Sequence, residues 1–293
     1  MGRGRRPGAA LERARVKRAG ALPWLLLGPI AVWNAVFFIV PLAVMIGHSV
    51  NDHGFSLARY RNLFTTPLYL SVMQTTFEIS LLVTIGCLLL GYPVAYRLTT
   101  AGPGTRTLML GLVLLPYWLD YIVRSYSWMV LLGRMGLVNR TLIDVGLIGA
   151  PLAILYTRWS VSIGMIQILL PLMVLTLYAA MLRIDTSLLQ AAAAHGASPS
   201  ASFWRVFFPL SLPGVYGACL LTFVTSLGFY ITPALLGGRK DTMISQLIVT
   251  VSTDMLDWSL ASAVSVLLLI VSLAIVVVYN RFFSIDRLWG GSA

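Results

Sequence analysis

Residues 184–214 read IDTSLLQAAAAHGASPSASFWRVFFPLSLPG and lie between two long apolar stretches of the chain. Ser187 and Gln190 have the spacing of a capping box, which satisfies free backbone N–H groups at the start of a helix. Four alanines, the strongest helix formers, follow Gln190, and Gly196 is the kind of residue that ends many helices. A helix of about two turns is therefore predicted between Ser187 and Gly196.

A second short helix is predicted directly afterwards. Ser198 is a good N-cap residue, and Pro199 suits the first helical position, where no N–H is needed. The helix would display four aromatic side chains, namely Phe203, Trp204, Phe207 and Phe208. Because residues four apart lie on one face of a helix, the rings form adjoining ridges before Pro209 ends or kinks the helix. Two short helices of this kind suit a groove on a soluble partner.

Outside this loop, the chain is too apolar for a water-soluble domain. Of its 293 residues, 58% are hydrophobic and only 11% are charged. A helix needs about 20 apolar residues to cross the hydrocarbon core of a bilayer. Six segments satisfy this length, at 22–47, 70–98, 107–132, 152–182, 213–236 and 259–283. We therefore expect an all-α membrane protein with six transmembrane helices in one domain, 22–283, between a basic segment, 1–21, and a tail, 284–293.

The basic residues indicate an orientation, because Lys and Arg gather on the cytoplasmic side of membrane proteins. With the N-terminus inside, thirteen basic residues fall in cytoplasmic segments and six fall outside. Both termini and the loop 183–212 are therefore predicted to be cytoplasmic. The run from Leu22 to Ile46 is too long for the apolar part of a cleaved signal peptide and is interpreted as a retained span. The basic residues before it are expected to lie along anionic lipid, an interpretation that we prefer to nucleic-acid binding.

The loop also carries a spaced motif. ABC importer permeases share the pattern Glu-Ala-Ala, three residues, Gly, nine residues, Ile, one residue and Leu-Pro. At those positions this chain has Gln190, Ala191, Ala192, Gly196, Val206, Phe208 and Pro209. Every spacing fits, two positions hold apolar replacements, and Gln190 is a departure that removes a charge. The chain thus resembles the ABC importer permeases, whose loop docks into a cleft of the ATPase subunit.

The resemblance implies roles for these residues. Gln190 through Gly196 would form the coupling helix, and Ala197, Val206 and Pro209 would belong to the rest of the ATPase-coupling loop. Without the Glu charge, one salt bridge to the ATPase is lost, while Gln190 keeps the capping geometry. We therefore expect docking that is weaker or differently tuned, and not absent.

The resemblance covers nearly the whole chain from about residue 20. Stretches such as GYPVAYRL (91–98), LLPYWLDYIVRSYSWMVLLG (114–133) and ILLPLMVLTLYAAM (168–181) are similar to the spermidine/putrescine permease subfamily. This implies a type I ABC importer permease fold in the bacterial inner membrane. The implied partners are a second homologous permease, two ATPase subunits that bind ATP and Mg, and a soluble or lipid-anchored solute-binding protein.

The implied solute is a polyamine such as spermidine or putrescine. Related permeases serve other small amines or amino acids, phosphonates or ferric ion, and these solutes stay open as alternatives. A rival class is the secondary transporter driven by an ion gradient, which typically shows internal repeats and broken helices. No clear repeat is visible in this sequence, and the loop 183–212 would have no role in such a protein.

Three charged residues are predicted at membrane depth, where charge is costly and usually functional. They are Glu78 in the second span and Asp120 and Arg124 in the third. The spacing of Asp120 and Arg124 allows an ion pair across one helical turn. This pair either neutralises itself against the bundle interior or belongs to the pathway or an external gate. Glu78 either pairs with Arg124 or offers negative charge to a passing cation.

Aromatic residues surround Asp120 and Arg124 in the sequence, among them Tyr126 and Trp128. Aromatic rings hold ammonium groups by cation–π attraction, which would suit a pathway for polyamines. An interfacial aromatic belt is the alternative interpretation.

The sequence predicts no enzyme site. It contains no GxxxxGK[ST] motif, so ATP hydrolysis is expected in a separate subunit and no cofactor is expected in this chain. The spans hold no Ser/His, paired Asp or HExxH constellation. His195 has no metal-ligating neighbour at a suitable spacing, and Cys87 and Cys219 are interpreted as packing residues.

Overall fold

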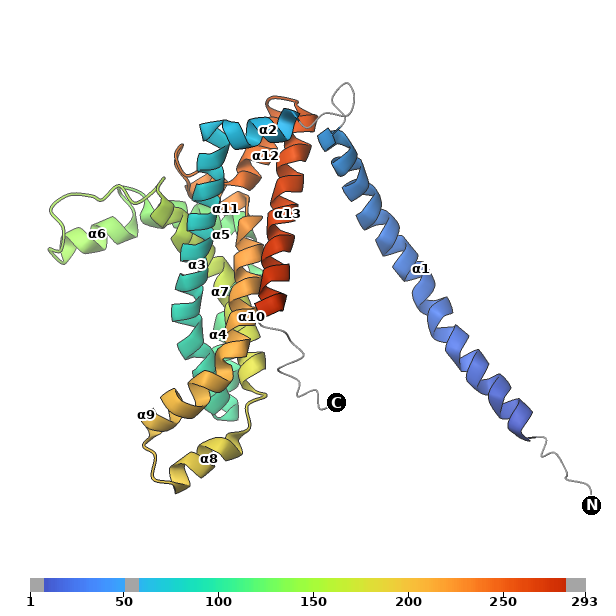
Figure 1. Ribbon diagram of the computed structural model, residues 1–293. Helices are drawn as coiled ribbons and strands as arrows, with labels where there is room; N and C mark the ends of the chain where they lie inside the picture. Colours follow the sequence, from blue (N-terminus) through green and yellow to red (C-terminus); the bar gives the residue numbers. More distant parts are fainter. Residues whose placement is uncertain (1–7, 51–57, 283–293) are drawn as a thin grey trace, which may run out of the picture.

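The computed structural model describes the backbone of residues 8–50 and 58–282, and the side chains of residues 27–50 and 59–281. Every regular element in these ranges is a helix (Figure 1). Five helices are long and apolar enough to cross a membrane, or six if one bent pair counts as a single span. The predicted all-helical membrane fold is therefore confirmed.

The elements follow one another along the chain with short connections. They are α1 Gly8–Val50, α2 Ala58–Thr65, α3 Pro67–Thr100, α4 Pro103–Leu114, the 3₁₀ turn η1 Leu115–Trp118, α5 Tyr121–Leu132, α6 Leu137–Asp144, α7 Arg158–Met181, α8 Thr186–Ala194, α9 Pro199–Ser202, the π-turn η2 Phe203–Phe207, α10 Phe208–Leu227, α11 Ile231–Leu236, α12 Ile244–Thr253 and α13 Trp258–Phe282.

The core is a bundle of α3, α7 and α10. Val83, Met165 and Met173 are completely buried where these helices meet. Lipid tails are as apolar as these side chains, so close packing, rather than escape from water, holds the helices together. Gly214 of α10 permits that packing, because a Cβ there would lie 2.4 Å from the Cβ of Ala180 on α7.

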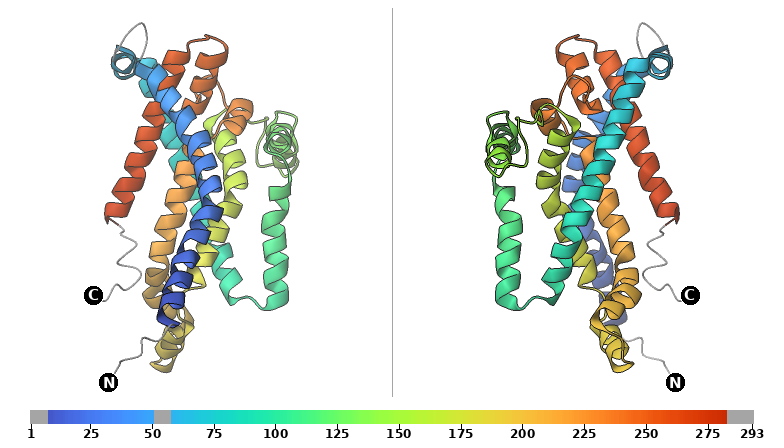
Figure 2. Two further views of the ribbon diagram at one scale, coloured as in Figure 1. Left: turned by 90° about the vertical axis from the view of Figure 1, so that its right-hand side faces the viewer. Right: turned by 90° about the vertical axis from the view of Figure 1, so that its left-hand side faces the viewer.

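A second apolar cluster joins α2, α3, α12 and α13 at one end of the bundle. Leu63 is 1% exposed in this cluster, and Val264 of α13 is buried beside it. Thr76 of α3 adds a polar tie, since its hydroxyl accepts a hydrogen bond from the Ile244 N–H at 2.9 Å. We call this the α2–α12 end, and the opposite end, which carries α8 and α9, the α8–α9 end (Figure 2).

The expected third span, 107–132, is not one straight helix. The chain bends by 95° between Pro103–Trp118 and the helical segment that begins at Tyr121. Pro116 lies in the 3₁₀ turn before the bend and lacks the N–H that an α-helix uses, and Asp120 has extended backbone angles. The side chain of Asp120 accepts a hydrogen bond from the Ile122 N–H at 2.7 Å and so begins a new helix.

The expected fifth span, 213–236, is also divided. Helix α10 ends at Leu227, and the separate short helix α11 begins at Ile231. The chain between them contains Gly228, which is a poor helix former. The segments expected at 70–98, 152–182 and 259–283 correspond to α3, α7 and α13.

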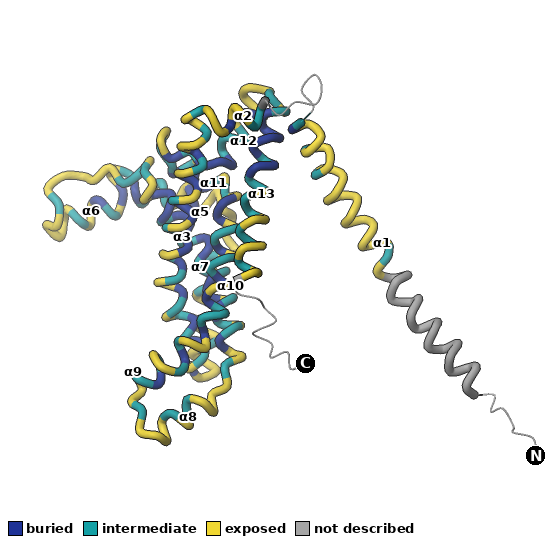
Figure 3. Tube along the Cα trace, in the orientation of Figure 1, coloured by how far each residue is buried: buried dark blue, intermediate teal, exposed yellow. Residues whose placement is uncertain are grey.

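Helix α1 is separate from the bundle along most of its length (Figure 1). It contacts α13 near its own C-terminal end and then diverges, and the most apolar stretch of α1 contains no buried residue. Large side chains on all sides of the helix, including Trp33, Val36 and Phe38, are at least half exposed (Figure 3). In a membrane, such a helix faces lipid or another protein.

Candidate functional site

Helix α8 is held in shape by its own caps. Asp185 is the N-cap residue, and its carboxylate accepts a hydrogen bond from the Ser187 N–H at 2.8 Å. The predicted capping box of Ser187 and Gln190 is therefore wrong, because the carboxylate of Asp185 caps the helix two residues earlier. Hydrogen bonds from Ser187 hold the pKa of Asp185 below its usual value.

The other end of α8 is a Schellman motif, as the glycine in the sequence predicts. Gly196 has a φ of +81°, a conformation that L-residues with a Cβ rarely adopt. Its N–H donates to the Ala193 carbonyl at 2.9 Å, and the Ala197 N–H donates to the Ala192 carbonyl at 3.0 Å. The prediction that the helix ends at Gly196 is confirmed.

No residue of α8 is buried. Gln190, Ala191 and His195 are exposed, while Ala192 and Ala197 are half-buried. The caps thus hold a short helix in a fixed shape while leaving it largely uncovered at the α8–α9 end (Figure 3). This arrangement leaves the helix accessible to a partner protein.

The second short helix begins as predicted and then differs. Ser198 accepts a hydrogen bond from the Ala201 N–H at 3.3 Å, and Pro199 occupies the first turn. Pro209 neither ends nor breaks the helix. The preceding residues form the π-turn η2, in which the Phe208 N–H donates to the Phe203 carbonyl, and α10 continues through Pro209. A π-turn of this kind changes the hydrogen-bond register before the residue that has no N–H.

Six aromatic side chains join this segment to α3 and form what we call the aromatic cluster. They are Tyr92, Tyr96, Phe203, Trp204, Phe207 and Phe208. The Tyr96 ring lies edge-on to Phe203 and Phe207, with ring centres 4.9 Å and 4.8 Å apart. The Tyr92 hydroxyl and the Ser211 hydroxyl are hydrogen-bonded at 2.8 Å. Edge-to-face pairs of this kind contribute about 0.5–1.5 kcal/mol each beyond the area that they bury, so the segment is joined to α3 as well as to α10.

Sequence reasoning missed the partners of this cluster on α3. A signal was present, because Tyr92 and Tyr96 are four residues apart and therefore share one face of a helix. The sequence alone could not say which helix that face meets.

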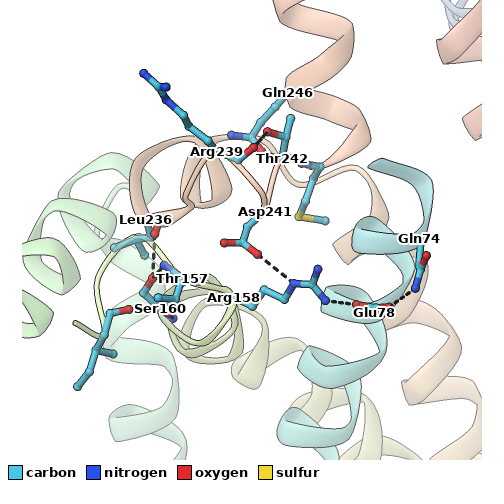
Figure 4. A network of polar contacts seen from close by, with 12 residues as sticks. Gln74, Glu78, Thr157, Arg158, Ser160, Leu236, Arg239, Asp241, Thr242 and Gln246 are labelled. Atoms are coloured by element: carbon cyan, nitrogen blue, oxygen red, sulfur yellow. Dashed lines mark hydrogen bonds and ion pairs between the residues drawn. The ribbon is translucent and has the colours of Figure 1, made fainter. Parts of the chain in front are cut away.

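At the α2–α12 end, Arg158 joins three elements in what we call the outer junction. Arg158 is the first residue of α7, and its Nε donates to the Asp241 carboxylate at 3.0 Å. One of its terminal nitrogens, Nη1, binds the Glu78 carboxylate of α3 (Figure 4). Gln74 supports Glu78 through a 2.7 Å hydrogen bond to its other oxygen. The predicted pairing of Glu78 with Arg124 is therefore wrong.

The predicted ion pair of Asp120 and Arg124 is also absent from the part of the chain that the structure describes. Asp120 is exposed and caps α5, so its carboxylate is used locally. Arg124 is 4% exposed, and its Nε and Nη1 atoms have no hydrogen-bond partner. Its guanidinium carbon lies 4.9 Å from the centre of the Tyr121 ring. The prediction failed because it assumed one continuous helix through the bend.

The two aromatic pathway candidates are in different surroundings. Tyr126 is 52% exposed, while Trp128 is half-buried against the core. The structure therefore does not bring Glu78, Asp120, Arg124, Tyr126 and Trp128 together into one site.

No family model matches the chain. The spermidine/putrescine permease PotB of Haemophilus influenzae is 36% identical over 257 residues, covering 85% of this chain and 90% of that protein. The PotB protein of Escherichia coli is 34% identical and covers 85% of this chain and 93% of its own length. The molybdenum permease ModB of Mycobacterium bovis is 30% identical over 86% of this chain and 91% of that protein.

Solved structures share the fold. A bacterial importer of the acidic polysaccharide alginate superposes with a TM-score of 0.71 at 21% identity, covering 92% of this chain and 97% of that chain. The same kind of transporter in complex with an alginate-bound periplasmic protein gives a TM-score of 0.74 at 20% identity, with 96% and 98% covered. The methionine transporter MetNI gives 0.59 at 19% identity, with 75% and 97% covered. From its sequence relatives and its fold, this chain belongs to the spermidine/putrescine family of ABC importer permeases.

Proposed function

We propose that this permease forms half of the pathway through which an ATP-driven importer carries a polyamine. The similarity to PotB proteins over 85% of the chain supports both the class and the solute. The observation that carries the coupling part of the proposal is α8, a helix with two complete caps and no buried residue. A preformed, uncovered helix needs little ordering when it enters a groove on a partner.

The coupling segment comprises residues 187–209. Gln190, Ala191, Ala192, Gly196 and Ala197 form the part that enters the ATPase subunit. Val206 and Pro209 belong to the part that returns to the bundle. Movement of α8 is passed to α10 through the π-turn η2 and to α3 through the aromatic cluster.

The proposed docking of α8 to the ATPase subunit implies an orientation of the chain in the membrane. The α8–α9 end faces the cytoplasm, where the ATPase subunits are, and the α2–α12 end faces outside. The first described residues of α1 lie toward the α8–α9 end (Figure 1), which supports a cytoplasmic N-terminus. The cytoplasmic C-terminus rests on the excess of basic residues in the inner segments, and the final residues lie outside the described part of the chain.

A second, homologous permease is the partner within the membrane. Helix α1 is exposed along its most apolar stretch, and α4 contains no buried residue. Near the bend, Tyr117, Trp118 and Val123 are all more than half exposed. These two exposed apolar surfaces, one on α1 and one along α4 and the bend, are suited to packing against a second subunit.

Residues of the bend are the candidates for the pathway. Asp120 at the bend and Tyr126 on α5 are exposed, where a second permease would complete a passage. Arg124 supports this region from inside, since it lies between the bend and the bundle. Glu78 contributes through the outer junction, and Trp128 contributes by packing.

The class and the solute are tested in one reconstituted system. The chain is purified with the proteins that bind it, and the complex is placed in liposomes containing ATP and supplied with its solute-binding protein. We expect uptake of labelled spermidine that requires ATP and is reduced by unlabelled putrescine but not by molybdate. Uptake driven by an ion gradient without ATP would overturn the importer class, and preference for molybdate would overturn the polyamine assignment.

A further inference from the structure

The loop between α11 and α12 is fixed against the start of α7. The Ser160 hydroxyl donates to the Leu236 carbonyl at 2.8 Å, and Arg158 binds Asp241. A Cβ at Gly238 would lie 2.4 Å from the Tyr156 carbonyl oxygen, so only glycine fits this approach. Tyr156 itself has a φ of 63°, which is uncommon for a residue with a side chain. The loop is thus presented in a defined shape.

A cavity of about 470 Å³ opens beside the outer junction. It lies between the first turns of α3 and the residues from the fixed loop to α12. Its lining is formed by Leu68, Ser71, Val72, Gln74, Thr75, Arg158, Arg239, Lys240, Thr242 and Leu247. Three of these residues are cationic and none is a carboxylate, so the cavity favours an anionic group.

Two of the three cations have no ion-pair partner among the described residues. Arg239 and Lys240 are exposed, and the side chain of Arg239 extends away from Asp241 (Figure 4). The third cation, Arg158, is 47% exposed although it binds two carboxylates. A carboxylate entering the cavity would therefore meet two unpaired charges and one shared charge.

The position of the cavity indicates which protein supplies this carboxylate. The proposed function places the cavity on the outer face, where the solute-binding protein arrives. The cationic lining of the cavity is complementary to an acidic side chain on the docking face of that protein. A polyamine itself would be repelled by Arg239 and Lys240.

We propose that this cavity receives an aspartate or glutamate side chain of the solute-binding protein, and that this carboxylate competes with Glu78 and Asp241 for Arg158. Docking then weakens the link between α3 and the loop of α11 and α12. The arrival of the loaded binding protein is thereby coupled to loosening of the outer junction. The inference rests on the proposed function and adds the docking residues to it.

The test uses the complete importer in nanodiscs and measures the affinity of a fluorescent, polyamine-loaded binding protein. Reversing the cavity charges with R239E/K240E is expected to raise the dissociation constant by about tenfold, because like charges then face each other. The matched control is R134E/R140E, which reverses two exposed charges in the α6 region outside the cavity and should leave the constant near the wild-type value. Glu78→Gln should tighten docking severalfold, because a competitor for Arg158 loses its charge.

Two further experiments identify the source of the anionic group that enters the cavity. Replacing acidic surface residues of the binding protein by lysine, one at a time, should restore docking to the R239E/K240E importer at one position. The titration is repeated in zwitterionic lipid alone, and an effect of R239E/K240E that needs anionic lipid would assign the cavity to a lipid headgroup and overturn the proposal.

The outcomes separate this inference from the proposed function. Wild-type docking together with unchanged docking of R239E/K240E, or an equal loss in R134E/R140E, overturns the cavity proposal and leaves the importer assignment standing. Failure of the wild-type importer to bind any polyamine-loaded protein overturns both.

Discussion

The two ends of this permease are built on different principles. At the α8–α9 end, α8 is shaped by hydrogen bonds between residues at most five apart, and none of its residues is buried. At the α2–α12 end, Arg158 binds residues 80 and 83 positions away and joins three elements. The caps of α8 keep its shape through local hydrogen bonds, whereas the second end depends on ion pairs between parts of the chain that are far apart in sequence.

This difference fits the two tasks proposed for them. A helix that transmits force from a soluble partner must remain rigid while it moves relative to the membrane, and local caps allow this. A gate must hold several elements in one arrangement and release them together, and shared ion pairs allow that. Mutations at the first end should therefore alter coupling without altering stability, and mutations at the second end should alter stability.

The largest effect is expected for Gly196→Val. Valine is strained at a φ of +81°, so the Schellman motif is lost and α8 no longer meets the ATPase in its docking shape. We expect ATP-driven uptake to fall by about tenfold or more, while the thermal stability of the purified permease hardly changes.

The matched control is Gly146→Val. Gly146 has a φ of +74° and, like Gly196, has open space around its Cα, but it lies in the connection after α6. Uptake by this variant should stay near the wild-type value. Equal losses in both variants would mean that backbone strain, and not coupling, explains the result.

The second effect concerns the aromatic cluster. Tyr96→Leu removes the edge-on contacts to Phe203 and Phe207 and should reduce uptake about threefold to fivefold, because each such pair contributes about 1 kcal/mol. ATP hydrolysis by the complex should continue and become less tightly coupled to uptake. Tyr96→Phe keeps the ring and should behave like the wild type, and a loss in this variant would assign the role to the hydroxyl.

The third prediction concerns the two carboxylates of the outer junction, whose variants are compared by thermal unfolding in detergent. The Asp241 side chain is 11% exposed and that of Glu78 is 41% exposed. Asp241→Asn should therefore lower the free energy of unfolding by about 1 kcal/mol and Glu78→Gln by a few tenths, since solvent screens exposed pairs. The reverse order would contradict the view that Asp241 holds the loop.

The smallest effect compares two capping aspartates, one at each end. Asp185 bonds only Ser187, whereas Asp257 accepts from the Leu260 N–H at 2.9 Å and also binds Arg59 at 2.6 Å. Burial raises the pKa of Asp257, but these hydrogen bonds and the charge of Arg59 outweigh it and leave the pKa below its usual value. The pKa of Asp185 is lowered as well.

A lowered pKa fixes the sign of the pH dependence. The stabilisation by each aspartate is complete above the pKa of the unfolded chain, about 3.9, and is lost as the pH falls through the lower folded value. Between pH 6 and pH 8 both caps should be constant. Asp257→Ala should lower the melting temperature more than Asp185→Ala, and loss of stability near neutral pH in the wild type would contradict this assignment.

The contrast between local hydrogen bonds and contacts between distant residues also explains what could be predicted from the sequence. The start of α9 at Ser198 and the turn at Gly196 depend on nearby residues, and both were predicted correctly. The choice of Ser187 over Asp185 as N-cap was a local error between two good capping residues. The long apolar helices were predictable because their length alone identifies them.

The errors at the bend and the outer junction have a different origin. Proline is tolerated in many membrane helices, so Pro116 indicates a kink or a helix end but not the angle of the bend or the new helix that begins at Tyr121. The pairing of Arg158 with Glu78 and Asp241 depends on how α3, α7 and the loop before α12 pack, and no local spacing reveals it. The Asp120 and Arg124 prediction failed because a correct spacing rule was applied to a helix that does not continue.

Helix α1 has a consequence for how the protein is made. Among the residues that the structure describes, α1 contacts α13 and its most apolar stretch has no buried residue, so this part of the chain does little to fix the path of the helix. When the permease is synthesised alone, this helix is therefore anchored at one end only, and its tilt is set by the surrounding lipid. If the proposed second permease covers this helix, the final step in the biogenesis of this subunit is its assembly, and the ratio in which the two permeases are produced controls how many copies reach their finished form.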